Sequence, residues 1–166
     1  MASKDSSFDV VSEVDMQEVD NAYQQTTKEL VQRYDLKDSH ATIELDKAKG
    51  VVTVQAPSEF VASQVIDVFQ TRLVRRKVDL SSVSFGDPQP ASAGTVRVIG
   101  TVVQGIEQEL AKKIGKDVRD AKFKVKVTVE GDKLKVSSPS KDALQAVIAF
   151  LREQDYGQPL QFTNYR

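Results

Sequence analysis

The sequence predicts an α+β protein in which one supersecondary unit of strands and helices is used twice. Two observations predict it: core positions that repeat at a spacing of 82 residues, and the same order of strand and helix patterns in each copy. At this spacing residues 55–58 (Gln-Ala-Pro-Ser) fall on residues 137–140 (Ser-Ser-Pro-Ser). Upstream the match needs no gap, and it pairs Val54 with Val136, Val52 with Leu134, Leu45 with Val127 and Ile43 with Val125.

The first copy begins with a short strand pattern at residues 8–14 and continues in a helix that Asp15 caps. Glu18 stands three residues after this cap, as in a capping box, and apolar residues recur at helical spacing up to about Tyr34. Two strands and a second helix follow. The strands cover residues 41–46 and 51–56 with a turn at Lys49-Gly50, and the helix opens at Pro57-Ser58 and carries Val61, Val65, Val68, Phe69 and Leu73.

The second copy has the same order. It consists of a strand at 95–103, a helix with Ile106, Leu110, Ile114 and Val118, a hairpin of 123–130 and 133–137, a helix that Ser140 caps, and a strand at 160–165. The order β-α-β-β-α-β is the ferredoxin-like plan. Residues 78–94, between the copies, are rich in Ser, Pro, Gly and Ala and are typical of a linker.

The formal net charge is −1. The sequence contains no cysteine, and this absence excludes disulfides, zinc–thiolate sites and thiol nucleophiles. The charge is divided unevenly: residues 1–94 hold 10 Lys and Arg against 15 Asp and Glu, and residues 95–166 hold 13 against 9. This division predicts that the second half binds any anionic ligand, unless it is a chance fluctuation between two solvated surfaces. The polar start, residues 1–7, and the short apolar stretch 146–151 predict a cytoplasmic protein.

The hairpin of the second copy alternates with a period of two. Its apolar members, Phe123, Val125, Val127 and Val129, should face the helices, and its polar members, Lys124, Lys126, Thr128 and Glu130, should face away together with Lys133 and Lys135. Because the helices of this plan cover one face of the sheet, the other face stays open, and here it is basic. The corresponding positions of the first copy are neutral or acidic.

Further cations lie on the helix before this hairpin. Lys112, Lys113, Lys116 and Arg119, followed by Lys122, Lys124 and Lys126, make seven cations within 15 residues. The alternative reading is the solvated face of an amphipathic helix. By alternation Tyr165 shares the open face with Gln161 and Thr163, where a tyrosine can stack on a base. The fingerprint of RNA-recognition motifs is absent, because the central strands carry Lys and Thr instead of aromatic residues.

No residue pattern indicates catalysis or a metal site. The glycine spacing of Gly100 and Gly105 matches a phosphate loop, but Ile106-Glu107 follow where Lys and Ser or Thr are needed. Gly105 is instead expected to begin a helix whose free N–H groups can bind one anion. His40 is the only histidine, so it cannot build a zinc site or a nucleophilic triad, and we expect it in a solvated loop.

The sequence resembles the YajQ family of small bacterial proteins over nearly its whole length. Seven segments carry the resemblance: 8–15 (FDVVSEVD), 41–45 (ATIEL), 104–107 (QGIE), 111–114 (AKKI), 122–127 (KFKVKV), 144–148 (LQAVI) and 157–166 (GQPLQFTNYR). Two positions depart from the family pattern. Val96-Arg97 replaces an aromatic and basic pair, and residues 137–141 are less basic than usual.

The resemblance implies two ferredoxin-like domains that exchange their first strands. Residues 15–103 would form the first domain, and residues 1–14 with 104–166 the second. It also implies nucleotide binding, with some members acting as cyclic di-GMP effectors that contact proteins or DNA, others linked to RNA, and no enzymes. No ligand-contact set is transferred, because the two departures affect the segments concerned.

Together these observations predict a non-catalytic nucleotide-binding protein without a cofactor or metal, with a guanine nucleotide or cyclic di-GMP as the ligand. An RNA-binding module that uses the basic sheet face, or a protein-interaction adaptor without a small ligand, are the alternatives. The residues predicted to bind the ligand are Lys112, Lys113, Lys116, Lys122, Lys124, Lys126, Arg97, Tyr165 and Arg166.

Overall fold

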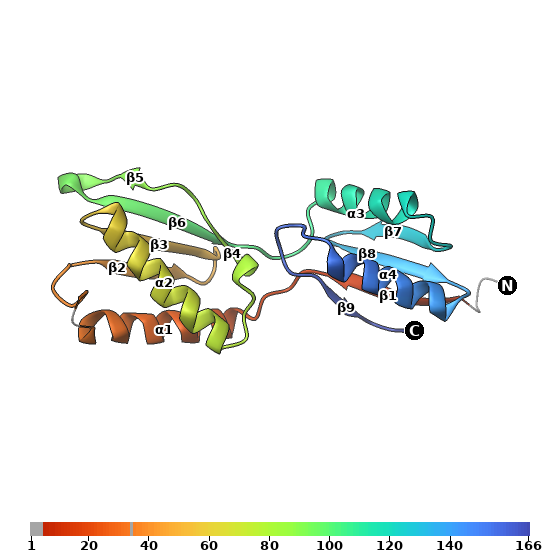
Figure 1. Ribbon diagram of the computed structural model, residues 1–166, viewed down its shortest axis with the longest axis horizontal. Helices are drawn as coiled ribbons and strands as arrows, with labels where there is room; N and C mark the ends of the chain where they lie inside the picture. The colour runs from red at the N-terminus through yellow and green to blue at the C-terminus, as the bar shows by residue number, and fades with distance from the viewer. Residues whose placement is uncertain (1–4, 34) are drawn as a thin grey trace. The chain divides into compact units, whose positions relative to one another are not determined.

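A computed structural model describes residues 5–33 and 35–166 (Figure 1). The chain divides into two compact units. Met1–Glu13 with Gln104–Arg166 form the terminal unit, and Val14–Val103 form the central unit. The described residues contain two sheets and four α-helices, which confirms the α+β class. Tyr34, where the first helix was predicted to end, and residues 1–4 of the polar start lie outside the described residues.

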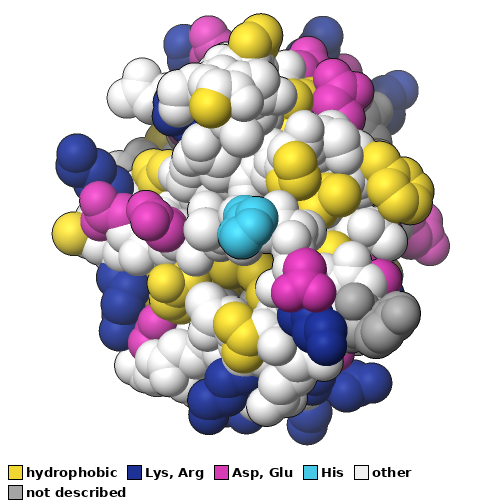
Figure 2. Space-filling view, turned by 90° about the vertical axis from the view of Figure 1, so that its left-hand side faces the viewer, with side chains coloured by type: hydrophobic (Ala, Val, Ile, Leu, Met, Phe, Trp, Pro, Cys, Tyr) yellow, Lys and Arg dark blue, Asp and Glu magenta, His cyan; other side chains and the backbone are white. Residues whose placement is uncertain are grey.

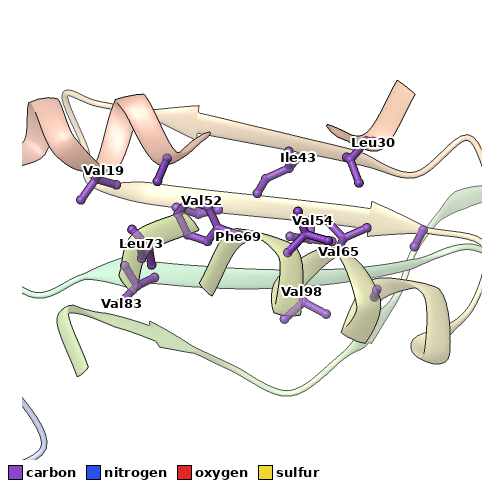
Figure 3. Packing of buried hydrophobic residues seen from close by; sticks show 14 of the residues in the cluster. Val19, Leu30, Ile43, Val52, Val54, Val65, Phe69, Leu73, Val83 and Val98 are labelled. Carbon is purple, nitrogen blue, oxygen red and sulfur yellow. The ribbon is translucent and has the colours of Figure 1, made fainter. Parts of the chain in front are cut away.

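The central unit contains two long helices and a five-stranded sheet. Its elements are α1 (Met16–Gln32), β2 (Thr42–Asp46), β3 (Val51–Ala56), α2 (Glu59–Arg75), β4 (Val83–Phe85), β5 (Gln89–Pro90) and β6 (Val96–Val102), with short 3₁₀ turns at Leu80–Ser82 and Ser92–Gly94. The strand order is β2-β3-β6-β4, and β5 also pairs with β6. The side chains between the helices and the sheet form the core of this unit (Figure 3).

Side-chain caps fix where the two helices of the central unit begin. The Asp15 carboxylate accepts hydrogen bonds from the backbone N–H groups of Gln17 and Glu18, as predicted for a cap. Glu18 does not complete the capping box within the helix: its carboxylate accepts two hydrogen bonds of 2.9 Å from Arg76. Ser58 caps α2 through the N–H of Val61. The helix starts are therefore set locally, as the sequence indicates.

The predicted linker at residues 78–94 is wrong. Val78 and Val83 are buried in the core of the central unit, and β4 pairs with β6 as the fourth strand of the sheet. Phe85 lies directly opposite Gly100, and its ring packs edge-on to Phe69 at 6.3 Å. The turn-forming composition hid a strand of only three residues, which is too short to show a period.

The terminal unit contains two helices and a four-stranded sheet. Its elements are β1 (Ser6–Val11), α3 (Gln108–Asp120), β7 (Lys126–Glu130), β8 (Lys133–Ser138), α4 (Lys141–Glu153) and β9 (Gln161–Thr163), and the strand order is β7-β8-β1-β9. A second core, which includes Phe8, Ile114 and Leu134, lies between the helices and this sheet. Each sheet thus has its own core.

In each sheet the third strand in the order comes from a part of the chain that is distant in sequence from the hairpin beside it. β1 precedes α1 of the central unit along the chain, yet it pairs with β8 and β9. β6 follows the other strands of the central unit and pairs with β3 and β4. In each case the strand completes the sheet between the second strand of a hairpin and a short edge strand.

Two predicted boundaries in the terminal unit are also wrong. The strand predicted from Phe123 begins at Lys126, because Lys122 has a left-handed φ of 61° and the Val125 N–H donates to the Phe123 carbonyl in a tight turn. Gly105 does not begin a helix. Its φ is 79°, its N–H donates to the Ser12 carbonyl at 2.7 Å, and α3 begins three residues later.

Candidate functional site

The lysines of α3 lie on the exposed side of the helix. Lys112, Lys113 and Lys116 are solvent-exposed, whereas Ala111, Ile114, Gly115 and Val118 face the core. The Lys113 ammonium lies 5.7 Å from the centre of the Tyr156 ring. The Tyr156 hydroxyl donates to Asp117 at 2.8 Å, and burial together with this hydrogen bond raises the pKa of that hydroxyl well above its usual range.

The three following lysines occupy different positions. Lys122 and Lys124 lie in the turn before β7, where the Lys124 carbonyl accepts a hydrogen bond from Ser138 Oγ. Lys126 lies in β7 opposite Ser137, on the face of the sheet away from the helices. Only Lys126 therefore takes the open-face position that alternation predicted for both Lys124 and Lys126.

An acidic residue lies in the middle of this open face. Asp9 of β1 is only 8% exposed, accepts a hydrogen bond from Asn164 Nδ2 at 2.8 Å, and lies 3.6 Å from the Lys133 ammonium. It is also directly opposite Lys135. The open face is therefore not uniformly basic, since its central position comes from the acidic start of the chain.

The pairing of β1 with β8 and β9 also changes how charge is divided between the two units. Because residues 1–13 belong to the terminal unit, that unit has 13 Lys and Arg against 12 Asp and Glu, and the central unit has 10 against 12. The contrast of the two sequence halves is thus largely removed by folding. What differs between the units is how the cations are paired.

Four of the five ion pairs among the described residues are in the central unit: Arg33–Asp35, Lys47–Asp20, Arg72–Glu29 and Arg76–Glu18. The terminal unit has the Lys133–Asp9 pair. Within the described part of the chain, none of the nine predicted ligand-binding residues forms an ion pair with an Asp or Glu side chain within 4.0 Å. Their cationic groups are therefore available to an anion without first breaking an ion pair.

Tyr165 does not lie on the open face, contrary to the alternation prediction. Thr163 is opposite Asp9, but the backbone groups of Arg166 exchange hydrogen bonds with Ser7, so the chain end has one residue more than β1. Asn164, at a φ of 59°, is the residue at this bulge. The extra residue turns Tyr165 to the helix side, where its ring centre is 6.2 Å from that of Phe8.

A cavity of about 290 Å³ opens beside this tyrosine. It is lined by Ser6, Ser7 and Phe8 of β1, by Lys141, Leu144, Gln145 and Ile148 of α4, and by Tyr165 and Arg166 at the chain end. Of the nine predicted residues, Tyr165 and Arg166 line it. Lys141 was missed because a single lysine after a helix cap looks like ordinary surface, and Ser6 and Gln145 carry no motif at all.

Arg97 is the one predicted residue outside the terminal unit. It lies in β6 of the central unit, opposite Gln55 on one side and Gln89 on the other, and its side chain is exposed. The other eight predicted residues all belong to the terminal unit. The structure therefore brings Tyr165 and Arg166 together at one cavity, spreads the lysines over α3, β7 and the turn between them, and does not join Arg97 to them.

His40 is exposed in the turn between α1 and β2, as expected for a loop histidine, and its imidazole lies at the surface (Figure 2). Among residues 5–33 and 35–166, no group of three or more His, Cys, Asp and Glu side chains is arranged to bind a metal ion. Nor does any helix in this part of the chain have the length and apolar character that crossing a membrane requires.

A family model described as "Nucleotide-binding protein YajQ-like" matches residues 6–166. The chain belongs to the YajQ-like family. This confirms the resemblance found in the sequence, and it covers both units. The YajQ-like match also includes all nine predicted ligand-binding residues, although it assigns no role to any of them.

Curated relatives of this YajQ-like chain match it along nearly their whole lengths. A protein of Magnetococcus marinus is 48% identical over 160 residues, which cover 96% of this chain and 98% of that protein. One from Desulfitobacterium hafniense is 46% identical over 164 residues, 99% of both chains, and one from Chloroherpeton thalassium is 44% identical over 160 residues, 96% of this chain and 97% of that protein. All three are named nucleotide-binding proteins.

Proposed function

We propose that this protein is a non-catalytic, cytoplasmic nucleotide-binding protein whose ligand is a guanine nucleotide or a cyclic dinucleotide such as cyclic di-GMP. The observation that carries the proposal is the cavity of the terminal unit, which combines an aromatic wall with cations that form no ion pair with Asp or Glu side chains among the described residues. A concave, largely apolar site with a few converging polar groups is the usual form of a small-ligand site. The names of the YajQ-like relatives support the same function.

We further propose that the units are two ferredoxin-like domains, residues 15–103 and residues 1–14 with 104–166, which arose as a tandem repeat and exchange their first strands. Two observations support this: the common strand order of the two sheets, and the pairing of β1 and β6 with strands distant in the sequence. No cofactor or metal takes part in the proposed function.

RNA binding is the second candidate, since Lys126 and Lys135 lie on the open sheet face. It is weaker than the first, because Asp9 occupies the centre of that face and Tyr165 is turned away from it. A protein-interaction adaptor without a small ligand is the third. In that case neither nucleotides nor RNA would bind at micromolar concentrations.

A panel of labelled nucleotides and single-stranded RNA, titrated at about 50 and about 200 mM salt, tests the proposal. Many phosphate contacts make RNA affinity fall steeply with salt, whereas a dinucleotide in a pocket carries few charges and should lose little. Charge reversal at Lys141 and Arg166, the cations that line the cavity, should weaken nucleotide binding by about 1 kcal/mol for each residue that binds a phosphate. Charge reversal at Lys112, Lys113, Lys124 and Lys126, which lie outside the cavity lining, tests the sequence prediction that these lysines bind the ligand. Reversal at Lys28, Lys47 and Lys49 of the central unit is the control, and equal weakening by this control set would contradict a site in the terminal unit.

A further inference from the structure

The cavity of the terminal unit is small for the ligands that the proposed function allows. At about 290 Å³ it is at the lower limit of small-molecule sites, which span about 300–1,000 Å³. This volume fits one nucleoside and leaves no room for a second. The size of the cavity therefore limits which part of a nucleotide ligand enters it.

The walls of the cavity are suited to a flat, aromatic group. Phe8 is fully buried at its base, and Leu144 and Ile148 of α4 form an aliphatic side. Tyr165 is 60% exposed, so part of its ring is free to contact a ligand. Bases stack on aromatic side chains irrespective of sequence, because every base has a π-face.

The bulge at Asn164 is what gives the cavity its aromatic wall. Without the extra residue, Tyr165 would follow the alternation of Gln161 and Thr163 and point to the opposite face of the sheet. The hydrogen bond of 2.8 Å from Asn164 Nδ2 to Asp9 fixes the bulge from the open face. Asn164 and Asp9 are thus positioning residues for Tyr165.

Two cations stand at the mouth of the cavity. Lys141 is in the first turn of α4, where the N-terminal N–H groups also favour an anion, and Arg166, whose backbone pairs with that of Ser7, lines the same cavity. Asp142 in the same turn opposes them. Two cations against one carboxylate leave a net positive charge, which suits one phosphate, and among the described residues the cavity lining holds no further cation for the other phosphates of a triphosphate, which should add little to the affinity.

We propose that this cavity binds one nucleoside monophosphate unit, with the base between Tyr165 and the aliphatic side of α4 and the phosphate at Lys141 and Arg166. The inference rests on the proposed nucleotide-binding function and deepens it. A second nucleoside, as in a cyclic dinucleotide, remains outside the cavity and adds little to the affinity.

The test is isothermal titration of the full chain with GMP, AMP, guanosine, GTP and cyclic di-GMP. We expect GMP to bind at least tenfold more tightly than guanosine, and GTP and cyclic di-GMP to bind within about threefold of GMP. Methyl NMR resonances of Leu144 and Ile148 should shift on addition of GMP. Cyclic di-GMP binding tenfold or more tightly than GMP would overturn the assignment to one nucleoside.

Variants of the cavity locate the site. Tyr165→Ala and Lys141→Glu should each weaken GMP binding tenfold or more, whereas Tyr165→Phe should stay within threefold because the ring is kept. Lys135→Glu, on the open face of the same sheet, is the matched control and should bind GMP like the unmodified chain. Thermal unfolding of each variant checks that the unit still folds.

Two further changes keep the test decisive if Tyr165→Ala is unstable. Gln145 is exposed at the rim, so Gln145→Trp should fill the cavity and abolish GMP binding without disturbing the core. Deletion of Asn164 should restore the alternation, turn Tyr165 away and abolish GMP binding although the ring is retained.

If the unmodified chain binds none of the nucleotides, the proposed function and this inference both fail. If GMP binds but these cavity variants all retain full affinity, only this inference fails.

Discussion

The terminal and central units use the same strand order but differ in the side chains at one end of the sheet. Ser137 lies opposite Ser7 and Gln55 lies opposite Arg97, so the start of β1 in one unit corresponds to the start of β6 in the other. At the 82-residue spacing Lys141 corresponds to Glu59. The cation at the mouth of the cavity is therefore replaced by an acid in the central unit.

The bulge beside the cavity has a counterpart in the central unit, but its residue differs. There Phe85 is opposite Gly100 and Gln89 is opposite Arg97, so the edge segment again has one residue more than its partner strand. The position before Gln89 is Pro88, whereas the position before Arg166 is Tyr165. The comparison teaches that both units share the extra residue in the edge segment, whereas the side chains of the proposed ligand site are present in the terminal unit.

The largest expected effect concerns the strands that complete each sheet. A fragment of residues 14–103 contains every strand of the central sheet and should unfold cooperatively. A fragment of residues 1–90 lacks β6, which pairs with β3, β4 and β5, and should not fold. Circular dichroism with urea titration of both fragments measures this. Cooperative unfolding of residues 1–90 would show that the central unit folds without β6, and it would contradict the view that this strand is needed to complete the sheet.

Exchange of the residues that differ between the units should affect one unit only. Lys141→Glu gives the terminal unit the residue of the central unit, and we expect it to lower GMP affinity at least tenfold. Glu59→Lys makes the reverse change, but Pro88 offers no aromatic ring there, so GMP affinity should stay within twofold. Titration calorimetry measures both. A second GMP site in Glu59→Lys would show that charge alone distinguishes the units.

The partner of the edge-strand aromatic residue also differs between the units. Phe85 lies over Gly100, and a Cβ at that glycine would meet the ring at 2.7 Å, whereas Phe162 lies opposite Val10. Gly100→Ala should therefore lower the free energy of unfolding by about 1–3 kcal/mol through overpacking. Chemical denaturation measures this decrease. The double variant Gly100→Ala/Phe85→Leu should recover part of it, and no recovery would point away from the ring as the cause.

The smallest effect concerns pH. Hydrogen bonds from Arg76 hold the pKa of the Glu18 carboxyl below its ordinary value of 4.5. A carboxyl with a lower pKa in the folded state adds stability above its unfolded pKa and loses it as the pH falls through the folded value. Arg76→Ala should thus be less stable than the unmodified chain at neutral pH, and the difference should shrink once the pH falls below the unfolded pKa of the carboxyl. Arg75→Ala, in the last turn of α2, is the control and should show no such pH dependence.

Local features were predictable from the sequence because they depend on neighbouring residues. The caps at Asp15, Ser58 and Ser140, the alternation of β8 and the hairpin turn at Gly131 each follow from a few adjacent side chains and backbone preferences. The repeat at 82 residues and the motifs of the YajQ-like family were likewise visible without a structure. These features determined the fold class and the nucleotide-binding hypothesis.

Three features depended on contacts between distant residues, and the tertiary structure alone decided them. Residues 83–85 form the strand β4 because they pair with the edge of β6, although their sequence has no strand pattern of its own. Asp9 lies on the face with Lys135 because β1 crosses to the sheet of the terminal unit, which removes most of the charge contrast. Tyr165 lines the cavity because a single extra residue at Asn164 reverses the alternation of the last strand, and a period of two cannot reveal such an insertion.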